Sequence, residues 1–495
     1  MGERAEGTLF RPEFNRSVRV EVAPSALTED AGAIFLRAVA DRLGLPSALA
    51  RVLDHRVQHL VTHPLAELLT TRILLLAQGW RDQDNADALR DDPALRLAVS
   101  TRTGTTPLQR PGTTLTPDGL ASQPTLSRMQ GMLGSQFNRF QLSEALVDRA
   151  CARILAAVGR RDEVTFDIDS FARPAHGKQE GVRYNGHYHM ECFHPLVAYA
   201  DTGDMLAVRL RPGNVHTADD VRSLLTPLLP KVQTLGKKVW LRMDCGYANG
   251  KLMAWLQQRH VKFITRLANN PGLRGAAKAW YDRTLAEWRL GPAADGRPRQ
   301  ATYEFWWRAK SWTNVLRVVT VLVERDYAHG ELFHHEFFLA TNAARTEGTS
   351  ADILARYRQR GEAEQRIGEF LTDIAAPVSS VPHPRKDTTA DARGPGVERQ
   401  VVHKRRVGAA ENEVSLLLGA FAYNLLHALR TELVPALGVR LSIKTLRERV
   451  LKTAATVTRH ARQVIVRINP AKASLWALVG RVMLPTVETT EGMPA

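Results

Sequence analysis

The chain is poor in cysteine, and the few cysteines it has are scattered. Cys151, Cys192 and Cys245 form no Cys-x-x-Cys pair. An odd and sparse set argues for a reducing compartment and against a disulfide framework or a cysteine-based zinc site. The 16 histidines show no spacing that would join them to the cysteines as ligands. We therefore assign no zinc.

Long apolar segments are also missing. The segment Leu68–Trp80 is interrupted by Arg72, and its longest apolar stretch, Ile73–Ala77, is far shorter than a membrane span. The first residues, Met1–Glu6, carry no apolar segment of the kind that signal peptides have. We therefore expect a cytoplasmic protein without a membrane partner.

Acidic residues are too few to balance the basic ones. Lys plus Arg number 67 against 51 Asp plus Glu, which gives a formal net charge of +16. Such an excess is typical of proteins that bind a polyanion, nucleic acid above all. The alternative is a basic protein from a GC-rich genome, in which arginine replaces lysine and no partner is implied. With 495 residues, 44% of them hydrophobic, the chain can form two to four domains with sizeable cores.

Hydrophobic periodicity changes several times along the chain. Leucines in Leu65–Ala77 recur at helical steps, whereas the runs after Val164 have the period of short strands that alternate with helices. Strands in a meander followed by alternating helices and strands predict an α/β fold with an RNase H-like sheet. The expected regions are a helical DNA-binding region at 1–150, the first part of the core at 160–275, a β-rich insertion at 276–345, a core helix at 346–374, a basic loop at 375–410 and a helical C-terminal region at 411–495.

Two of the predicted strands end on aspartates. Val164–Asp169 carries Asp167 and Asp169, which lie on one side of a strand because they are two residues apart. Val239–Asp244 ends on a third aspartate, Asp244. An unpaired buried carboxylate is costly, so this concentration indicates a functional site, with Asp169 as its first ligand and Asp167 in reserve. The alternative is solvated aspartates at strand ends and turns.

A later segment, Tyr357–Arg366, adds a third carboxylate. Tyr357, Arg360 and Glu364 stand at i, i+3 and i+7, so one helical face can offer an acceptor to a metal and a guanidinium to a phosphate. The alternative is a solvated helix with pairs such as Glu362–Arg366. Three carboxylates can bind two Mg²⁺ ions and leave positions open for phosphate and water. Together with the positive charge, this pattern predicts an enzyme that cuts and joins DNA.

The order and spacing of these residues resemble the DDE insertion-sequence transposases with a Tyr-x2-Arg-x3-Glu-x6-Lys signature. On that resemblance Asp169, Asp244 and Glu364 are the catalytic and metal-binding residues. Flanking phrases make the chain similar to the insertion sequence thirteen-eighty family over roughly residues 60–470. These phrases are Gly79–Pro93, Ser122–Arg128, Tyr184–Gly186, His194–Leu196, Leu210–Asn214 and Ala420–Leu426.

The resemblance implies an RNase H-like catalytic core with a β-rich insertion and helical flanks. It implies two Mg²⁺ ions, for which Mn²⁺ can substitute, and phosphoryl transfer that cleaves the ends of an insertion sequence and joins them to target DNA. The implied partner is double-stranded DNA, as terminal inverted repeats and as target, bound by a homodimer at the bacterial nucleoid. Tyr357 and Arg360 are expected to contact this DNA.

Four aromatic residues within the expected insertion allow two interpretations. The resemblance implies that Trp306 and Trp307, beside Phe305 and near Trp312, stack on a base flipped out of the transposon end. The alternative is ordinary packing in the core of a sheet.

One position departs from the signature. The family's lysine stands seven residues after Glu364, where this chain has Leu371. Arg385 or Lys386, in the expected basic loop, could supply the missing phosphate contact. Two other functions therefore stay open: an RNase H-like nuclease that never joins strands, and a catalytically decayed protein that only binds the element's ends.

Overall fold

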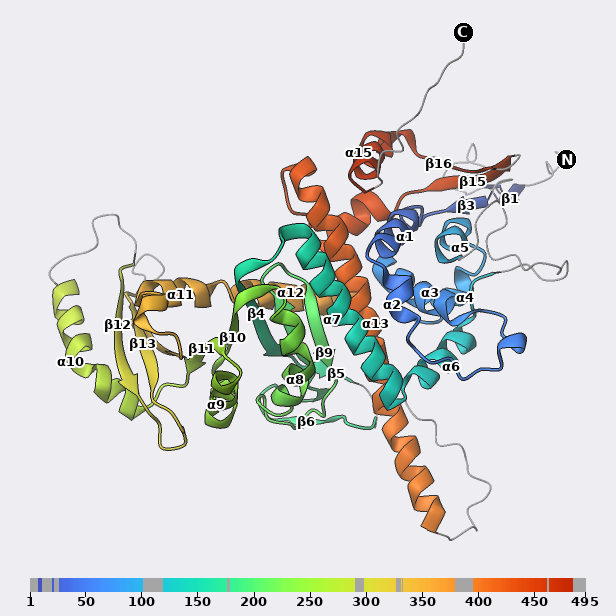
Figure 1. Ribbon diagram of the computed structural model, residues 1–495. Helices are drawn as coiled ribbons and strands as arrows, with labels where there is room; N and C mark the ends of the chain where they lie inside the picture. The colour runs from blue at the N-terminus through green and yellow to red at the C-terminus, as the bar shows by residue number, and fades with distance from the viewer. Residues whose placement is uncertain are drawn as a thin grey trace. The chain divides into compact units, whose positions relative to one another are not determined.

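The computed structural model divides into two compact units. One comprises Met1–Met132 with Leu425–Ala495, and the other comprises Leu133–Asn424. The division falls within the long helix α13 (Pro395–Leu437) (Figure 1). The structure describes residues 8–10, 20–21, 26–100, 119–175, 179–289, 298–325, 331, 333–378, 395–460 and 463–483, with the backbone alone at 8–10, 20–21, 395–408 and 459–460.

The first unit is mainly helical and contains a small three-stranded sheet of order β16-β15-β3 and a separate two-stranded sheet. Its helices are α1 (Ala33–Arg42), α2 (Leu45–Leu49), η1 (Gln58–Leu60), α3 (Leu65–Gln78), α4 (Asn85–Ala88), α5 (Pro93–Val99), α6 (Gln123–Leu133), α14 (Ile443–Leu446), η5 (Arg447–Leu451), η6 (Pro470–Lys472) and α15 (Ala473–Met483). Its strands are β1 (Thr8–Phe10), β2 (Val20–Glu21), β3 (Ala26–Thr28), β15 (Ala455–His460) and β16 (Gln463–Ile468).

Helix α3 is the one that the leucine spacing predicted, and nearly all of it is buried. It ends at Gly79, whose φ of 92° is a conformation that other residues rarely adopt, so glycine stops the helix there. The expectation that residues 411–495 are helical throughout is wrong, because β15 and β16 pair as an antiparallel hairpin and β15 also pairs with β3.

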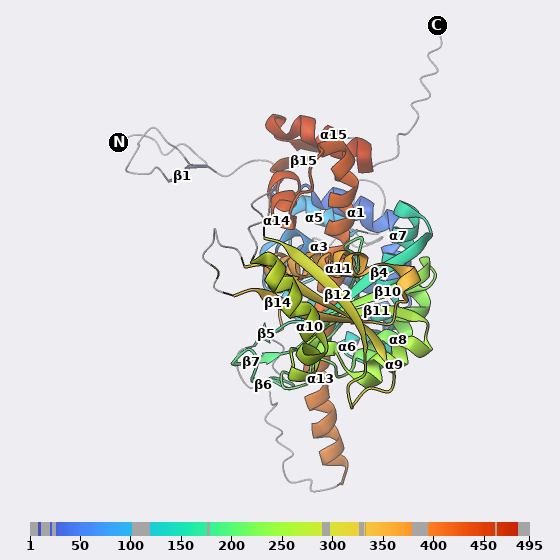
Figure 2. The same cartoon turned by 90° about the vertical axis from the view of Figure 1, so that its left-hand side faces the viewer.

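The second unit is built on one eight-stranded mixed sheet of order β12-β13-β14-β11-β10-β4-β8-β9 (Figures 1 and 2). Its strands are β4 (Arg161–Ser170), β8 (Leu196–Ala200), β9 (Met205–Arg209), β10 (Gly236–Met243), β11 (Val261–Leu267), β12 (Gln300–Trp307), β13 (Leu316–Val323) and β14 (His335–Thr341). Strands β4, β8 and β9 form an antiparallel meander, and β10 pairs in parallel with both β4 and β11. The predicted α/β class is confirmed.

The remaining elements of this unit are helices and a small sheet of order β5-β7-β6. The helices are α7 (Gln136–Val158), α8 (Val221–Val232), η2 (Cys245–Tyr247), α9 (Gly250–Gln258), α10 (Pro271–Trp288), η3 (Arg345–Glu347), α11 (Ser350–Arg358), α12 (Gly361–Glu369), the π-helix η4 (Phe370–Ile374) and the first part of α13. The small sheet consists of β5 (Arg173–Pro174), β6 (Arg183–Asn185) and β7 (Met190–Phe193).

Two expected regions differ from the structure. The strands of the predicted insertion at 276–345 form no sheet of their own, because β14 pairs with β11 and β12–β14 extend the main sheet. The predicted basic loop at 375–410 is helical from Pro395 onward. Arg385 and Lys386 lie outside the described residues.

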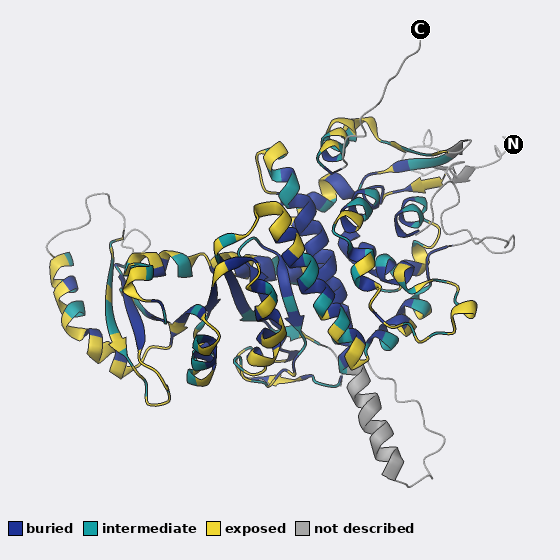
Figure 3. Ribbon diagram, viewed as in Figure 1, coloured by how far each residue is buried: buried dark blue, intermediate teal, exposed yellow. Residues whose placement is uncertain are grey.

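Side chains alternate across strand β4, in the middle of the sheet. Val164, Phe166 and Ile168 point into the larger hydrophobic core, which α7, α8 and α9 cover. Asp167 and Asp169 alternate with them and therefore lie on the opposite side of the sheet. Figure 3 shows that the central strands are buried, so acidic residues on them need partners.

The other face of the sheet carries a smaller core around Trp240 of β10. Ile353 and Leu354 of α11 pack into it. This contact brings the α11–α12 segment to the same side of the sheet as the aspartates of β4. Among the described residues, no helix is both long and apolar enough to cross a membrane.

Candidate active site

Asp169 and Asp244 come from neighbouring parallel strands. Arg242 of β10 pairs in register with Asp167 of β4, and two residues further on in each strand direction come Asp244 and Asp169. The carboxyl ends of parallel strands meet at one edge of a sheet, so the two aspartates lie close together. Asp244 accepts a hydrogen bond from the backbone N–H of Gly246 at 2.9 Å, which orients its carboxylate at the start of η2.

Glu364 of α12 joins this edge through Arg360. Nη2 of Arg360 donates to Oδ2 of Asp169 at 2.5 Å, and Nη1 donates to Oε1 of Glu364 at 2.9 Å. The Arg360 side chain is only 10% exposed, whereas that of Glu364 is 65% exposed. The structure thus brings together Asp169, Asp244 and Glu364, here called the carboxylate cluster, around one guanidinium that is open to solvent on the Glu364 side.

The electrostatics of the carboxylate cluster reflect an excess of negative charge. Burial raises the pKa of Asp169 to about 6, with Asp244 and Glu364 adding to the rise and Arg360 opposing it. Burial works against the charge of Arg360, but Asp169 and the other neighbouring acids raise the pKa of its guanidinium. A cation therefore stabilises this site, and Arg360 supplies one positive charge for three acids.

The oxygen donors of the cluster suit a hard divalent cation, since Mg²⁺ prefers carboxylate ligands. In this conformation Arg360 stands between Asp169 and Glu364 and bonds to both. Consistent with that arrangement, no group of three or more His, Cys, Asp or Glu side chains within the described part of the chain is placed to hold a metal ion.

Asp167, the reserve candidate for the first ligand, lies in a different environment. Its carboxylate is 1% exposed and accepts from Nε and Nη2 of Arg242 at 2.6 and 2.7 Å. Nη1 of Arg242 also donates to the carbonyl oxygen of Arg356 at 2.9 Å. This buried pair, Asp167 with Arg242, ties β4 to β10 and holds the end of α11, with both carboxylate oxygens already used.

The expected helical stripe of Tyr357, Arg360 and Glu364 is interrupted. Tyr357 ends up in α11 and Glu364 in α12, with Arg360 at the junction as the N-cap of α12. Tyr357 packs against the smaller core rather than standing free, and burial raises its pKa to about 12. The break turns Arg360 inward to Asp169, which one continuous solvated helix would not do.

The two tryptophans of β12 have opposite environments because strand side chains alternate. Trp307, together with Phe305, packs against the larger core, and their rings meet edge to face at 6.4 Å. Trp306 points the other way and is 57% exposed. Trp307 is half-buried against this core, and Trp306 is the more exposed of the two tryptophans.

Two tyrosines beside the carboxylate cluster were missed by the sequence reasoning. Burial raises the pKa of Tyr247, and Asp169 adds to the rise. Burial also raises the pKa of Tyr188, to which Asp169 and Asp244 both contribute. The phrase Tyr184–Gly186 was an available signal for the second of them, since Tyr188 follows it by two residues.

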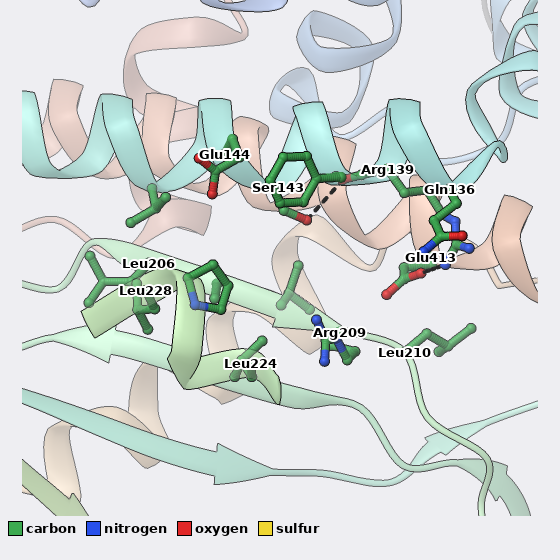
Figure 4. A pocket seen from close by; sticks show the side chains of 15 residues that line it. Gln136, Arg139, Ser143, Glu144, Leu206, Arg209, Leu210, Leu224, Leu228 and Glu413 are labelled. Atoms are coloured by element: carbon green, nitrogen blue, oxygen red, sulfur yellow. Dashed lines mark hydrogen bonds and ion pairs between the residues drawn. The ribbon is translucent and has the colours of Figure 1, made fainter. Parts of the chain in front are cut away.

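Two cavities lie apart from this site. One, in the second unit, has a volume of about 360 Å³ between α7, α8 and β9, with the ion pair of Arg139 and Glu413 on its wall (Figure 4). The other, in the first unit, has a volume of about 590 Å³ and is lined by Arg56, Arg90 and Arg128 among others. No residue of the carboxylate cluster lines either cavity.

No curated protein matches this chain. Among solved structures it is similar to the cryo-EM structure of piggyBac transposase synaptic complex with hairpin DNA, with a TM-score of 0.35 and 10% sequence identity. That match covers 86% of this chain and 77% of the other.

A family model gives a match over most of the chain, at residues 10–383 and 403–483. The first matched segment includes the whole carboxylate cluster and the elements that carry it. The chain belongs to the family described as transposase DDE domain group 1.

Proposed function

We propose that this transposase cleaves the ends of an insertion sequence and joins them to target DNA at the carboxylate cluster. The observation that carries the proposal is the convergence of Asp169, Asp244 and Glu364 from three separate elements around Arg360. Family membership supports the same reaction class. Phosphoryl transfer needs no covalent protein intermediate, so the chain needs only to position DNA and stabilise charge.

The three residues of the carboxylate cluster would hold two Mg²⁺ ions, or Mn²⁺ in their place. When bound, such ions lower the pKa of an attacking water and stabilise the leaving oxygen. Before loading, Arg360 holds Asp169 and Glu364 together and offsets their repulsion. Its forked, permanently charged guanidinium is also suited to contact a phosphate oxygen once the acids have another cation.

We further propose that the main sheet contains an RNase H-like core. The support is the order β9-β8-β4-β10-β11, in which an antiparallel meander is followed by two strands parallel to β4. Membership of the insertion sequence thirteen-eighty family rests on the flanking phrases. The signature lysine is replaced by Leu371, which lies in the π-helix η4 and not in a continuing α-helix.

The proposed partner is double-stranded DNA, as the element's inverted repeats and as target, bound by a homodimer at the nucleoid of a bacterial cell. The net charge of +16 and the family support DNA as the partner. Recognition of the ends is assigned to residues 1–150. Contact with a flipped or stacked base is assigned to Trp306 and Trp307. A fragment of residues 1–150 that shows no preference for the element's ends over random duplex would overturn the first assignment.

The test uses the full chain and DNA fragments that carry the inverted repeats flanking its gene. Asp169→Ala, Asp244→Ala and Glu364→Ala should each abolish metal-dependent cleavage while DNA binding survives. Glu362→Ala is the matched control, since Glu362 is an exposed glutamate of the same helix that pairs with Arg366 instead. Cleavage retained by any one of the three alanine variants would remove that residue from the site.

The same assay separates the two alternatives. A nuclease would cut the fragments yet give no joined products with a target plasmid. A decayed end-binding protein would bind the ends and cut nothing with Mg²⁺ or Mn²⁺.

A further inference from the structure

Three sequence segments that contribute no residue to the carboxylate cluster are joined to one another by hydrogen bonds. They are Tyr184–Gly186, His194–Leu196 and Leu210–Asn214. Nδ2 of Asn185 donates to the carbonyl oxygen of Gly213 at 2.7 Å. The backbone N–H of His194 donates to the carbonyl oxygen of Arg211 at 3.0 Å, so segments far apart in sequence form one wall.

Buried groups make this wall rigid. Arg211 is 1% exposed, and its guanidinium donates to the carbonyl oxygens of His194 at 2.9 Å and Asp219 at 2.6 Å. Gly213 lies so close to the β6–β7 hairpin that an added Cβ atom would meet the carbonyl oxygens of Cys192 and Arg183. Only glycine permits this approach, so the hairpin is held at a fixed distance from the segment that follows β9.

The turn of the hairpin is fixed by one buried side chain. Oδ1 of Asn185 accepts from the backbone N–H groups of His187 at 2.9 Å and Tyr188 at 3.2 Å. The Tyr188 ring then packs edge to face against His187 and His194, at centroid distances of 4.8 and 5.8 Å. These contacts hold the aromatic ring in one orientation. They use the ring and not its hydroxyl group.

The segments that hold this ring lie against the residue that orients Asp244. An added Cβ atom at Gly246 would meet the Thr217 side chain at 2.9 Å, and the carbonyl oxygen of Thr217 accepts from Arg211 at 3.0 Å. Tyr188 is partly buried, and both Asp169 and Asp244 add to the rise that burial causes in its pKa. Within the described residues the Tyr188 hydroxyl makes no hydrogen bond. The Tyr188 hydroxyl is thus held rigidly and is free to donate a hydrogen bond. Because DNA is proposed to bind at Asp169 and Asp244, a phosphate oxygen is a suitable acceptor.

We propose that Tyr188 is a substrate contact whose hydroxyl donates a hydrogen bond to a non-bridging phosphate oxygen of the DNA strand held at Asp169 and Asp244. Asn185, Gly213 and Arg211 act as positioning residues for it. This inference rests on the proposed function, because it takes the carboxylate cluster as the place where DNA is cut.

The first test is single-turnover cleavage of an element end by the full chain carrying Tyr188→Phe, which removes only the hydroxyl. A hydrogen bond to a charged phosphate corresponds to a loss of roughly tenfold to a hundredfold in cleavage rate. The matched control is Tyr184→Phe, since Tyr184 stands on the same hairpin, is 58% exposed and meets His189 at 3.5 Å. Its rate should equal that of the unmodified protein, and both variants should unfold at the unmodified protein's temperature.

The second test measures binding and needs no cleavage. Each phosphate around the cleavage position is replaced in turn by an uncharged methylphosphonate. The unmodified protein should lose affinity at the contacted phosphate, and Tyr188→Phe should be insensitive at that position alone. Equal losses for both proteins at every position would overturn the contact.

The outcomes separate the inference from the function on which it rests. If Glu364→Ala is inactive and Tyr188→Phe cuts as fast as the unmodified protein, the tyrosine contact is wrong and the proposed function stands. If the unmodified protein cuts no DNA with either metal, the proposed function fails, and the methylphosphonate scan then decides the contact by itself.

Discussion

Two carboxylates, Asp167 and Asp169, stand two residues apart on the same strand. Burial raises the pKa of both, but their partners differ. In the buried pair, both oxygens of Asp167 are bonded by one arginine, Arg242, and the two side chains are 1% and 2% exposed. In the carboxylate cluster, Arg360 is shared between Asp169 and Glu364, and Asp244 and Glu364 add to the rise that burial causes in the pKa of Asp169. The Asp167–Arg242 pair has one positive charge for one acid. The carboxylate cluster has one positive charge for three acids, so a further cation would stabilise it.

We propose that the number of charged partners, and not the residue type, separates a structural acid from a functional one. Removing one member of a complete buried pair leaves a charge without compensation. Removing an acid from a crowded cluster relieves repulsion. Four substitutions or titrations test this difference.

The largest expected effect is on DNA cleavage at the carboxylate cluster. Asp169→Asn should lower cleavage by about a thousandfold or more, since it removes a ligand that faces both other acids. The unfolding temperature should stay level or rise, because a repelled carboxylate is replaced by a neutral amide. A cleavage gel and a thermal melt on the same preparation measure both. A variant that cuts DNA normally would place Asp169 with the structural acids.

A change in the buried pair of Asp167 and Arg242 should lower the stability of the fold. Asp167→Asn leaves the Arg242 guanidinium buried and unpaired, so the free energy of unfolding should fall by about 3–5 kcal/mol. Urea unfolding measures it. The matched control is Asp162→Asn, because Asp162 pairs with Lys237 between the same two strands at an exposed position and its loss should leave stability unchanged. Equal effects of the two changes would refute the structural role.

The free energy of unfolding, measured against pH in the presence of a chelator, should show the raised pKa of Asp169. Folding raises the pKa of Asp169 from 3.8 to about 6, so the folded state holds the proton more tightly. The contribution of this raised pKa to the free energy of unfolding is fully present below about pH 4 and is lost as the pH rises through about 6. Asp169→Asn should therefore gain about 2–3 kcal/mol relative to the unmodified protein between these values. A constant difference across that range would contradict the raised pKa.

The smallest expected effect is stabilisation by metal. Mg²⁺ at about ten times its dissociation constant should stabilise the unmodified protein by about 1.4 kcal/mol. Asp169→Asn should lose this gain, whereas Asp162→Asn should keep it. Differential scanning fluorimetry with and without Mg²⁺ measures the shift. A gain that survives in Asp169→Asn would show that the metal binds elsewhere.

Much of the fold followed from local patterns. The alternation in Val164–Asp169 and the apolar run at Val239–Met243 predicted β4 and β10, and the leucine spacing predicted α3. The continuation of the main sheet through β12–β14 was not predictable in this way, because strand pairing depends on distant hydrogen-bond partners. The hairpin of β15 and β16 did have a local signal in its β-branched residues, which the helical interpretation overlooked.

By itself, the sequence determined which acids to consider: periodicity placed Asp167, Asp169 and Asp244 at the ends of buried runs, and spacing added Glu364. It could not separate Asp167 from Asp169, because residues two apart on a strand share a face. Only the tertiary structure shows that their partners differ: Asp167 bonds Arg242 from the neighbouring strand, and Asp169 bonds Arg360 from a helix junction. The reason is physical: a carboxylate's role depends on how many charges and donors surround it, and those come from chain segments far away in sequence.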